Sequence, residues 1–143
     1  MRKYILTVIC LLLVGIGTAS AKRQQVGKMY MFGMAAAFTD TIVHFTNIQA
    51  VDSVWIDTKN DFLEERKAYS YQLRDFLNQK QQMPNRTCIV FYAQKREKLE
   101  KKYLKLKNLY TKEKDGKQHF DVRYIPDSDF MFTTVKSVID DEQ

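Results

Sequence analysis

The feature that most restricts the fold is the run TCIVFYA, Thr87–Ala93, which lies between two segments of helical periodicity. The run is almost wholly apolar and rich in β-branched and aromatic residues, with turn-forming residues before it and charged residues after it. Such a run predicts a β-strand, and its apolar character on both faces predicts an interior strand. A strand between two helices limits the chain to folds in which helices pack on a sheet.

The segment before this strand has the pattern of an amphipathic helix. Asp61 is a candidate N-cap, and Glu64 three residues later completes the spacing of a capping box. The apolar side chains that follow helical spacing are Phe62, Tyr69, Leu73, Phe76 and Leu77. The pattern ends at residues 79–82, and Pro84 prevents its continuation.

The segment after the strand, residues 95–114, is the most basic part of the chain. It holds nine Lys or Arg and three Glu, and its local charge of +6 equals the net charge of the whole chain. One apolar stripe recurs at i, i+4, i+7 and i+11, and two further leucines are expected to widen it: Leu99, Tyr103, Leu106 and Tyr110, with Leu104 and Leu109. The stripe predicts a helix packed on the sheet, with lysines facing solvent and pairs such as Glu97–Lys101 moderating the charge.

Two further pairs of strands are expected at the ends of the domain. Residues 30–38 are apolar on both faces of an alternating pattern, and one face carries mainly small side chains, at Gly33, Ala35 and Ala37. A turn at Thr39–Asp40 leads into a second strand over residues 41–51. Residues 54–56 are a short strand or a plug against the core. At the other end, residues 119–125 alternate, residues 126–129 form a turn by composition, and residues 130–135 are expected to pair with the preceding strand.

The predicted order is therefore β-β-α-β-α-β-β. We expect a single α/β domain, bordering on α+β, with a mixed sheet of about five strands and two helices packed on one face of it. The domain is expected over residues 22–143, with residues 22–28 and 140–143 frayed.

The first 21 residues have the three parts of a secretory signal peptide. Arg2 and Lys3 form a positive start, residues 5–16 form an apolar core, and the small residues 19–21 precede an expected cleavage between Ala21 and Lys22. The core is shorter than the roughly 20 residues of a membrane span, although an uncleaved anchor is the alternative. We therefore expect an exported protein, periplasmic or extracellular, that is soluble after cleavage. Removing residues 1–21 leaves 122 residues and lowers the net charge from +6 to +4.

The sequence offers few candidates for chemistry. There is no glycine-rich phosphate loop, no nucleophile elbow and no set of residues with metal-ligand spacing, so we expect neither a metal nor a cofactor. A nucleophile–base pair would have to combine Cys88, in the apolar strand, with His44 or His119. The alternative is a buried free thiol and two histidines that face solvent from separate strands.

The basic helix offers a surface for anions rather than a catalytic site. Its lysines lack the bidentate geometry of arginine, which together with export makes nucleic acid an unsuitable partner. A solvated face is the simplest interpretation, and the alternative is weak docking of an anionic envelope polymer, lipid headgroups or an acidic protein. The candidates for such docking are Lys98, Lys101, Lys102 and Lys105.

The stretches YSYQLRDFL and MPNRTCIVFYAQKREKLEKKYLKLK give the mature chain a wider resemblance. The chain resembles small exported proteins of unknown function from Bacteroidetes. The resemblance implies a location in the Gram-negative envelope and assigns no activity or site residue. The leading hypothesis is a non-catalytic binding or interaction module, and the alternative is an exported hydrolase that uses Cys88 or the histidines.

Overall fold

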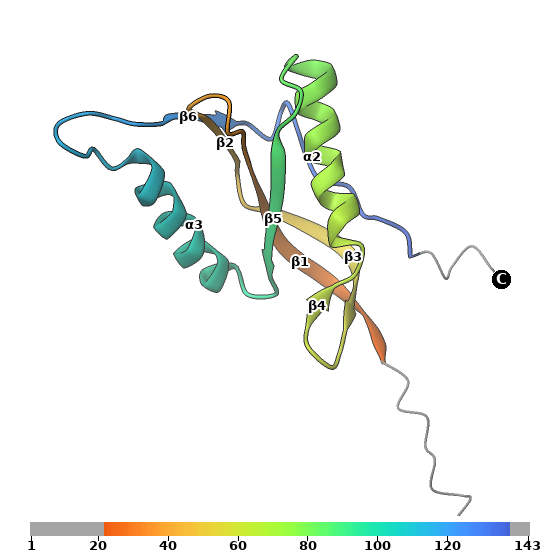
Figure 1. Ribbon diagram of the computed structural model, residues 1–143. Helices are drawn as coiled ribbons and strands as arrows, with labels where there is room; N and C mark the ends of the chain where they lie inside the picture. The colour runs from red at the N-terminus through yellow and green to blue at the C-terminus, as the bar shows by residue number, and fades with distance from the viewer. Residues whose placement is uncertain (1–21, 138–143) are drawn as a thin grey trace, which may run out of the picture.

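The computed structural model describes residues 22–137, which form one sheet flanked by two helices (Figure 1). The expected signal peptide and the acidic C-terminal residues lie outside the described residues. The elements, in chain order, are β1 (Arg23–Ala36), β2 (Ile42–Thr46), β3 (Gln49–Asp57), β4 (Phe62–Leu63), α2 (Arg66–Lys80), β5 (Thr87–Ala93), α3 (Arg96–Thr111) and β6 (Asp121–Ile125).

The long strand β1 is the centre of the sheet. Along one edge it pairs antiparallel with β2 and β3, which follow each other in the chain, and along its other edge it pairs antiparallel with β5. The strand β4 extends the sheet beyond β3, and β6 pairs parallel with β2. The predicted mixed sheet with two helices is confirmed, with six strands and an α+β character.

The first residues of the domain are not frayed, contrary to expectation. Arg23 pairs with Asp57, and the ladder between β1 and β3 continues from there to Met31. Backbone pairing requires no apolar side chains, so the polar residues 23–28 form the first part of β1. Within it, Val26 packs against the core, while Gln24 and Gln25 remain exposed.

The two helices lie on opposite faces of the sheet, whereas the sequence predicted one face. The ring of Phe32 packs edge-on against Tyr103 of α3, with the ring centroids 4.9 Å apart. At the next residue, Gly33, an added Cβ would lie 2.6 Å from Leu73 of α2. Successive residues of a strand point to opposite faces, so the two contacts place α2 and α3 on opposite sides.

The direction of the two connections explains this arrangement. The helix α2 leads from β3 across β1 to β5, and α3 leads back from β5 across β1 and β2 to β6. Each connection joins parallel strands, for which a right-handed crossover is strongly preferred. Two crossovers of the same hand that run in opposite directions place their helices on opposite faces.

The strand β5 has the predicted bounds but a different position. It pairs only with β1, so it is an edge strand rather than an interior one. Its side chains are nevertheless covered on both faces, because Val90 packs in the core beneath α2 while Phe91 packs in the core beneath α3. The strand is therefore apolar on both faces because a helix covers each face, and not because it has a neighbouring strand on each side.

The helix α2 begins at Arg66 rather than at Asp61. Phe62 and Leu63 pair with the end of β3, and Glu65, with φ 56° and no capping side-chain hydrogen bond, is the N-cap residue. The capping-box prediction at Asp61 and Glu64 is therefore wrong. Glu64 instead forms an ion pair with Arg23, with Arg23 Nε 2.5 Å from Glu64 Oε1, so it ties the helix start to β1.

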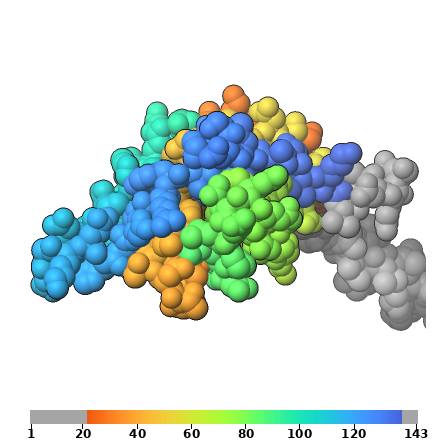
Figure 2. All heavy atoms as spheres, turned by 90° about the horizontal axis from the view of Figure 1, so that it is seen from above, coloured from red at the N-terminus to blue at the C-terminus, as the bar shows by residue number. Residues whose placement is uncertain are grey.

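The last predicted strand is absent from the described residues. Residues 130–137, which we name the C-terminal strap, have no regular structure, although Phe130 and Phe132 are buried in the core beneath α2. Figure 2 shows this dark blue segment packed beside the green atoms of α2. The alternating pattern therefore reflects the burial of Phe130 and Phe132 on one side of the segment, although its backbone pairs with no strand.

Side chains take the place of a partner strand along the strap. The amide of Gln49 donates to the Phe130 carbonyl at 3.0 Å and accepts from the Phe132 N–H at 2.8 Å. The amide of Gln72 makes the same pair of bonds to Thr133, at 2.8 and 2.9 Å. The Gln49 bonds satisfy buried backbone groups that would otherwise lack a partner at a cost, and the Gln72 bonds hold Thr133 at the surface. The strap is therefore an integral part of the face that carries α2.

Candidate functional site

Cys88 is held as an inert thiol. It lies at the start of β5, half-buried against the core beneath α2. Burial raises the pKa of the Cys88 thiol to about 11, and this effect outweighs the opposing influence of Arg74 and Arg86. Since the thiolate is the nucleophilic form of cysteine, Cys88 is not prepared for nucleophilic attack at neutral pH.

His44 is buried on β2, whereas the sequence predicted a histidine that faces solvent. Its neighbours Val43 and Phe45 point toward α3, so the imidazole points to the opposite face, beneath α2. Burial, followed by the charges of Arg86 and Arg123, lowers the pKa of His44 to about 4. The imidazole is therefore neutral at pH 7, and its Nδ1 has no hydrogen-bond partner within residues 22–137.

The sheet places Cys88 and His44 in one row but does not join them. Cys88 is paired with Ala35 of β1, and Ala35 is paired with His44 of β2. Two inter-strand spacings separate their backbones by about 10 Å. With the pKa of the thiol raised and that of the imidazole lowered, the row lacks the thiolate–imidazolium pair that a cysteine nucleophile needs.

His119 lies apart from both residues. It precedes β6, in a segment without regular structure rather than in the predicted strand, and it is exposed. It lines a polar hollow together with Thr41 and Asp121, whereas His44 lines a different cavity. The structure therefore does not bring the three catalytic candidates of the sequence into one site.

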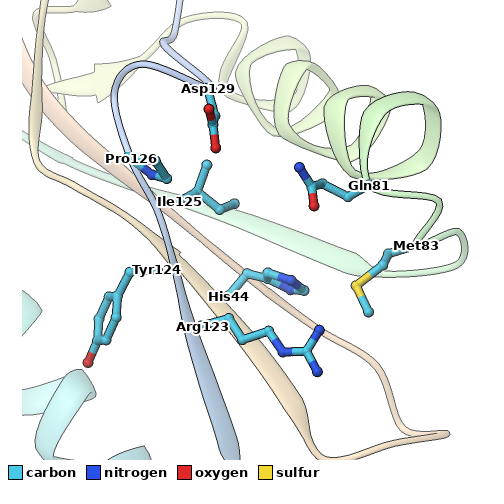
Figure 3. A pocket seen from close by; sticks show the side chains of 8 residues that line it. All are labelled: His44, Gln81, Met83, Arg123, Tyr124, Ile125, Pro126 and Asp129. Atoms are coloured by element: carbon cyan, nitrogen blue, oxygen red, sulfur yellow. The ribbon is translucent and has the colours of Figure 1, made fainter.

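The cavity at His44 lies between the end of α2 and the segment that runs from β6 to Asp129 (Figure 3). It has a volume of about 170 Å³ and is lined by His44, Gln81, Met83, Arg123, Tyr124, Ile125, Pro126 and Asp129. Arg123 is already bound by Asp121, with nitrogen–oxygen distances of 3.1 and 2.9 Å, and Asp129 adds a further negative charge at the rim. The charges of opposite sign offset each other, so the cavity has no clear preference for an anion or a cation.

Residues 22–137 contain no group of three or more His, Cys, Asp or Glu side chains that could hold a metal ion. Over the same residues, no helix is long and apolar enough to cross a membrane.

The four docking candidates of the sequence, Lys98, Lys101, Lys102 and Lys105, are all exposed on α3. None of them takes part in an ion pair of the described residues. The expected pair of Glu97 with Lys101 is absent there, and Arg96 instead binds Glu100 at 2.9 Å on another side of the helix. The positive charge of this surface is thus less neutralised than the sequence predicted.

The apolar stripe of α3 is narrower than predicted. Leu99 alone is fully buried, whereas Tyr103, Leu106 and Tyr110 are half-buried. Leu104 and Leu109, which were expected to widen the stripe, are 54% and 59% exposed. The helix therefore contacts the sheet along one line and leaves its flanks open.

Cations of α3 cover aromatic rings of the sheet beside that line. The ammonium of Lys102 lies 4.9 Å from the ring centroid of Phe91 on β5, and that of Lys107 lies 5.1 Å from the ring of Tyr124 on β6. Such contacts are stabilised by the negative face of the ring. They also place the Lys102 flank of α3 beside β5 and the Lys107 flank beside β6.

The sequence interpretation missed the basic residues of α2 that lie beside the same strand. Arg66 donates from Nε to the Val90 carbonyl of β5 at 3.2 Å, and its guanidinium lies 5.6 Å from the ring of Tyr92. Arg74, two helical turns further on, is close enough to Cys88 to affect the pKa of its thiol. The sequence shows that Arg66 and Arg74 are eight residues apart and so share one flank of the helix. It does not show that β5 lies beside that flank.

Comparison with known proteins adds no assignment. No family model matches the chain, and no significant match was found among curated proteins or among solved structures.

Proposed function

We propose that the protein is an exported, non-catalytic binding module whose helix α3 docks on an anionic partner. The observation that carries this proposal is the row of exposed lysines on α3, which have no carboxylate partner within residues 22–137. Clustered unpaired charge of one sign produces a field that attracts partners of the opposite sign. The apolar stripe fixes the helix on the sheet, so the row is presented on a rigid element.

The alternative, a hydrolase that uses Cys88 or the histidines, has less support. Its nucleophile would be a protonated thiol, and its base would be an imidazole two strands away with a pKa of about 4. His119 lies in a separate hollow. An arrangement of this kind lacks the hydrogen-bonded nucleophile and base of known covalent catalysis.

The test of docking measures binding of fluorescein-labelled polyglutamate by fluorescence anisotropy at low and physiological salt. Replacing Lys98, Lys102 and Lys105 with Gln should weaken binding at low salt by about tenfold or more, because three charges are removed from one row. The matched control replaces Lys59, Lys114 and Lys117, which are exposed elsewhere on the molecule, and should retain most of the binding. Equal losses in the two variants would show that only the net charge matters.

The class of partner is tested with the same variants. Vesicles with anionic headgroups and an anionic polysaccharide replace polyglutamate in parallel titrations. Binding to either one that is tighter than binding to polyglutamate would assign the row to that class. No binding to any of the three at low salt would refute the proposed function.

Export is tested separately. Expressed from its own N-terminus in a Gram-negative host, the protein should be recovered from the periplasm with Lys22 as its first residue. A soluble cytoplasmic product that still begins with Met1 would contradict export.

A further inference from the structure

Within residues 22–137, the strand β5 has a strand partner along one edge only, and on its other edge the side chain of Arg66 covers the fully buried Val90. The Val90 carbonyl accepts a hydrogen bond from the side chain of Arg66, not from β1. The N–H of its ladder partner Gly33 points toward β2, where it donates to Thr46 Oγ1 at 2.8 Å. Val90 and Gly33 therefore form a pair that exchanges no backbone hydrogen bonds. The N–H and C=O groups of Val90 point away from β1, and those of Gly33 point away from β5.

The alternation of an antiparallel ladder extends this result along the strand. Cys88, Val90 and Tyr92 direct their N–H and C=O groups to the open side, and apart from the Arg66 bond none of these groups has a partner within residues 22–137. The strand contains neither proline nor a charged residue, which are the usual means of blocking an edge. The exposed side chain of Arg66 lies over the centre of this edge, so a further strand can pair with the edge once that side chain moves aside.

Both helices place cations beside this edge. On the face that carries α2, Arg66 and Arg74 lie near β5. On the face that carries α3, Lys102 covers the ring of Phe91, and Lys98 and Lys105 share its helix flank at i and i+7. A strand added to β5 would direct its side chains alternately toward these two basic flanks.

The distribution of charge selects the kind of strand. In a symmetrical pairing of β5 with β5 of a second copy, the two sheets would be continuous and the two α3 helices would lie on the same face, with their Lys98–Lys102–Lys105 flanks opposed. Like charges brought together in this way disfavour the dimer. On the α2 flank Arg74 is paired with Asp75 at 3.0 Å, so an acidic strand would be attracted mainly by Arg66 and by the lysines of α3.

We propose that the edge of β5 is the site at which an acidic, extended segment of a partner protein adds to the sheet as a seventh strand. This inference rests on the proposed docking function and specifies how the partner is held. Backbone hydrogen bonds to Cys88, Val90 and Tyr92 would provide the pairing, and the lysines of α3 would select for Asp or Glu. A membrane surface or a polysaccharide lacks the peptide N–H groups that such pairing requires.

The decisive experiment uses two N-methylated versions of one peptide. The probe is a blocked, fluorescein-labelled peptide of seven residues in which glutamate alternates with threonine, titrated against the full mature chain. One version carries N-methyl groups on every second amide, and the other carries them on the remaining amides. Because only alternate amides of an added strand face β5, one version should lose binding by about tenfold or more, and the other should bind like the parent peptide.

Variants of the protein separate pairing from simple charge attraction. Replacing Lys98, Lys102 and Lys105 with Gln should weaken binding of the parent peptide. The control variant at Lys59, Lys114 and Lys117 should bind it as the wild type does. If both N-methylated peptides bind like the parent but still depend on Lys98, Lys102 and Lys105, the strand inference is overturned and the docking function stands. If no version binds while polyglutamate does, the same conclusion holds; if polyglutamate also fails, both proposals fail.

A second copy as the occupant is tested by sedimentation velocity. The mature chain should remain monomeric at physiological salt, and replacing Lys98, Lys102 and Lys105 with Gln should increase any self-association. A wild-type dimer that dissociates when the acidic peptide is added would assign the edge to a second copy and overturn the inference.

Discussion

The two faces of the sheet are covered in different ways. On one face, α2 buries Tyr69, Leu73 and Leu77, and the C-terminal strap fills the space beside it with Phe130 and Phe132. On the other face, α3 buries only Leu99 of its own side chains, and its lysines lie over the half-buried ring of Phe91 and the exposed ring of Tyr124. The first face is closed by two segments, whereas the second is closed by one helix along a single stripe.

The face beneath α2 contributes mainly to the stability of the fold, whereas the face that carries α3 presents charged side chains to solvent. The face beneath α2 is sealed by apolar side chains, by hydrogen bonds that Gln49 and Gln72 donate to the strap, and by the bond that the Val135 N–H donates to the Tyr69 hydroxyl. The face beneath α3 has open flanks, and the unpaired lysines lie there. We therefore expect substitutions beneath α2 to act on folding and substitutions on α3 to act on binding.

The largest expected effect is the loss of a buried leucine beneath α2. Leu73→Ala should lower the free energy of unfolding by about 2–5 kcal/mol, because it removes a fully buried side chain and leaves a cavity. Leu106→Ala on α3 should cost less, since that side chain is half-buried, and Leu104→Ala should stay within about 0.5 kcal/mol. Chemical denaturation measures all three. Equal costs at Leu73 and Leu106 would contradict the comparison of the two faces.

The pH dependence of stability is the next largest effect and belongs to the face beneath α2. The pKa of His44 is about 4 in the folded protein and 6.5 in its unperturbed state, so the unfolded chain binds more protons between these values. Stability should therefore fall as the pH is lowered from 6.5 to 4, by up to about 3 kcal/mol. The measurement is denaturation at a series of pH values.

The matched variants for this prediction are His44→Gln and His119→Gln. The first should flatten the pH dependence over that window even if it changes the absolute stability, because no buried imidazole remains to be protonated. The second removes an exposed histidine and should keep the slope of the wild type. A His44→Gln protein with an unchanged slope would show that carboxylates alone cause the dependence.

The close approach of α2 to the sheet predicts a smaller effect at Gly33. A Cβ there would lie 2.6 Å from Leu73 Cδ2 and 3.1 Å from Phe132 Cζ, so Gly33→Ala should cost about 1–3 kcal/mol through overpacking. In the background of Leu73→Ala the same substitution should cost less, because the nearer contact has been removed. Strictly additive losses in the double variant would contradict the described packing.

The smallest effect on stability is expected where the effect on binding is largest. Replacing Lys98, Lys101, Lys102 and Lys105 with Gln should change the free energy of unfolding by less than about 0.5 kcal/mol, because all four side chains are exposed. The wild type should be retained on a cation exchanger at low salt and released near physiological salt, and the variant should not be retained. Retention that persists at physiological salt and depends on these lysines would indicate a specific site instead of a general field.

Periodicity in the sequence was enough to find most elements. The strand Thr87–Ala93 has the predicted bounds, the hairpin around Thr39–Asp40 is present, and the stripe from Leu99 to Tyr110 does face the sheet. In each case the side chains alternate or recur with the period of the element they form. The exposure of the four docking lysines followed from the same pattern.

Other features were decided by contacts between distant segments. The sequence placed β5 inside the sheet, both helices on one face and a strand at residues 130–135, and the structure differs on all three. The burial of His44 likewise depends on α2 crossing to the face opposite α3, which no local pattern records. The outer edge of β5 and its basic surroundings arise from these same long-range choices.

By itself, the sequence determined the approximate places of the two helices and of most strands, the period at which apolar side chains recur, and where positive charge is concentrated. The tertiary structure alone decided which strand edges are paired, which face each helix covers and how the strap is held. The physical reason is that side-chain periodicity reports contact with an apolar surface, whatever element supplies that surface. The pairing of backbone edges leaves no such trace, because every residue except proline carries the same N–H and C=O groups.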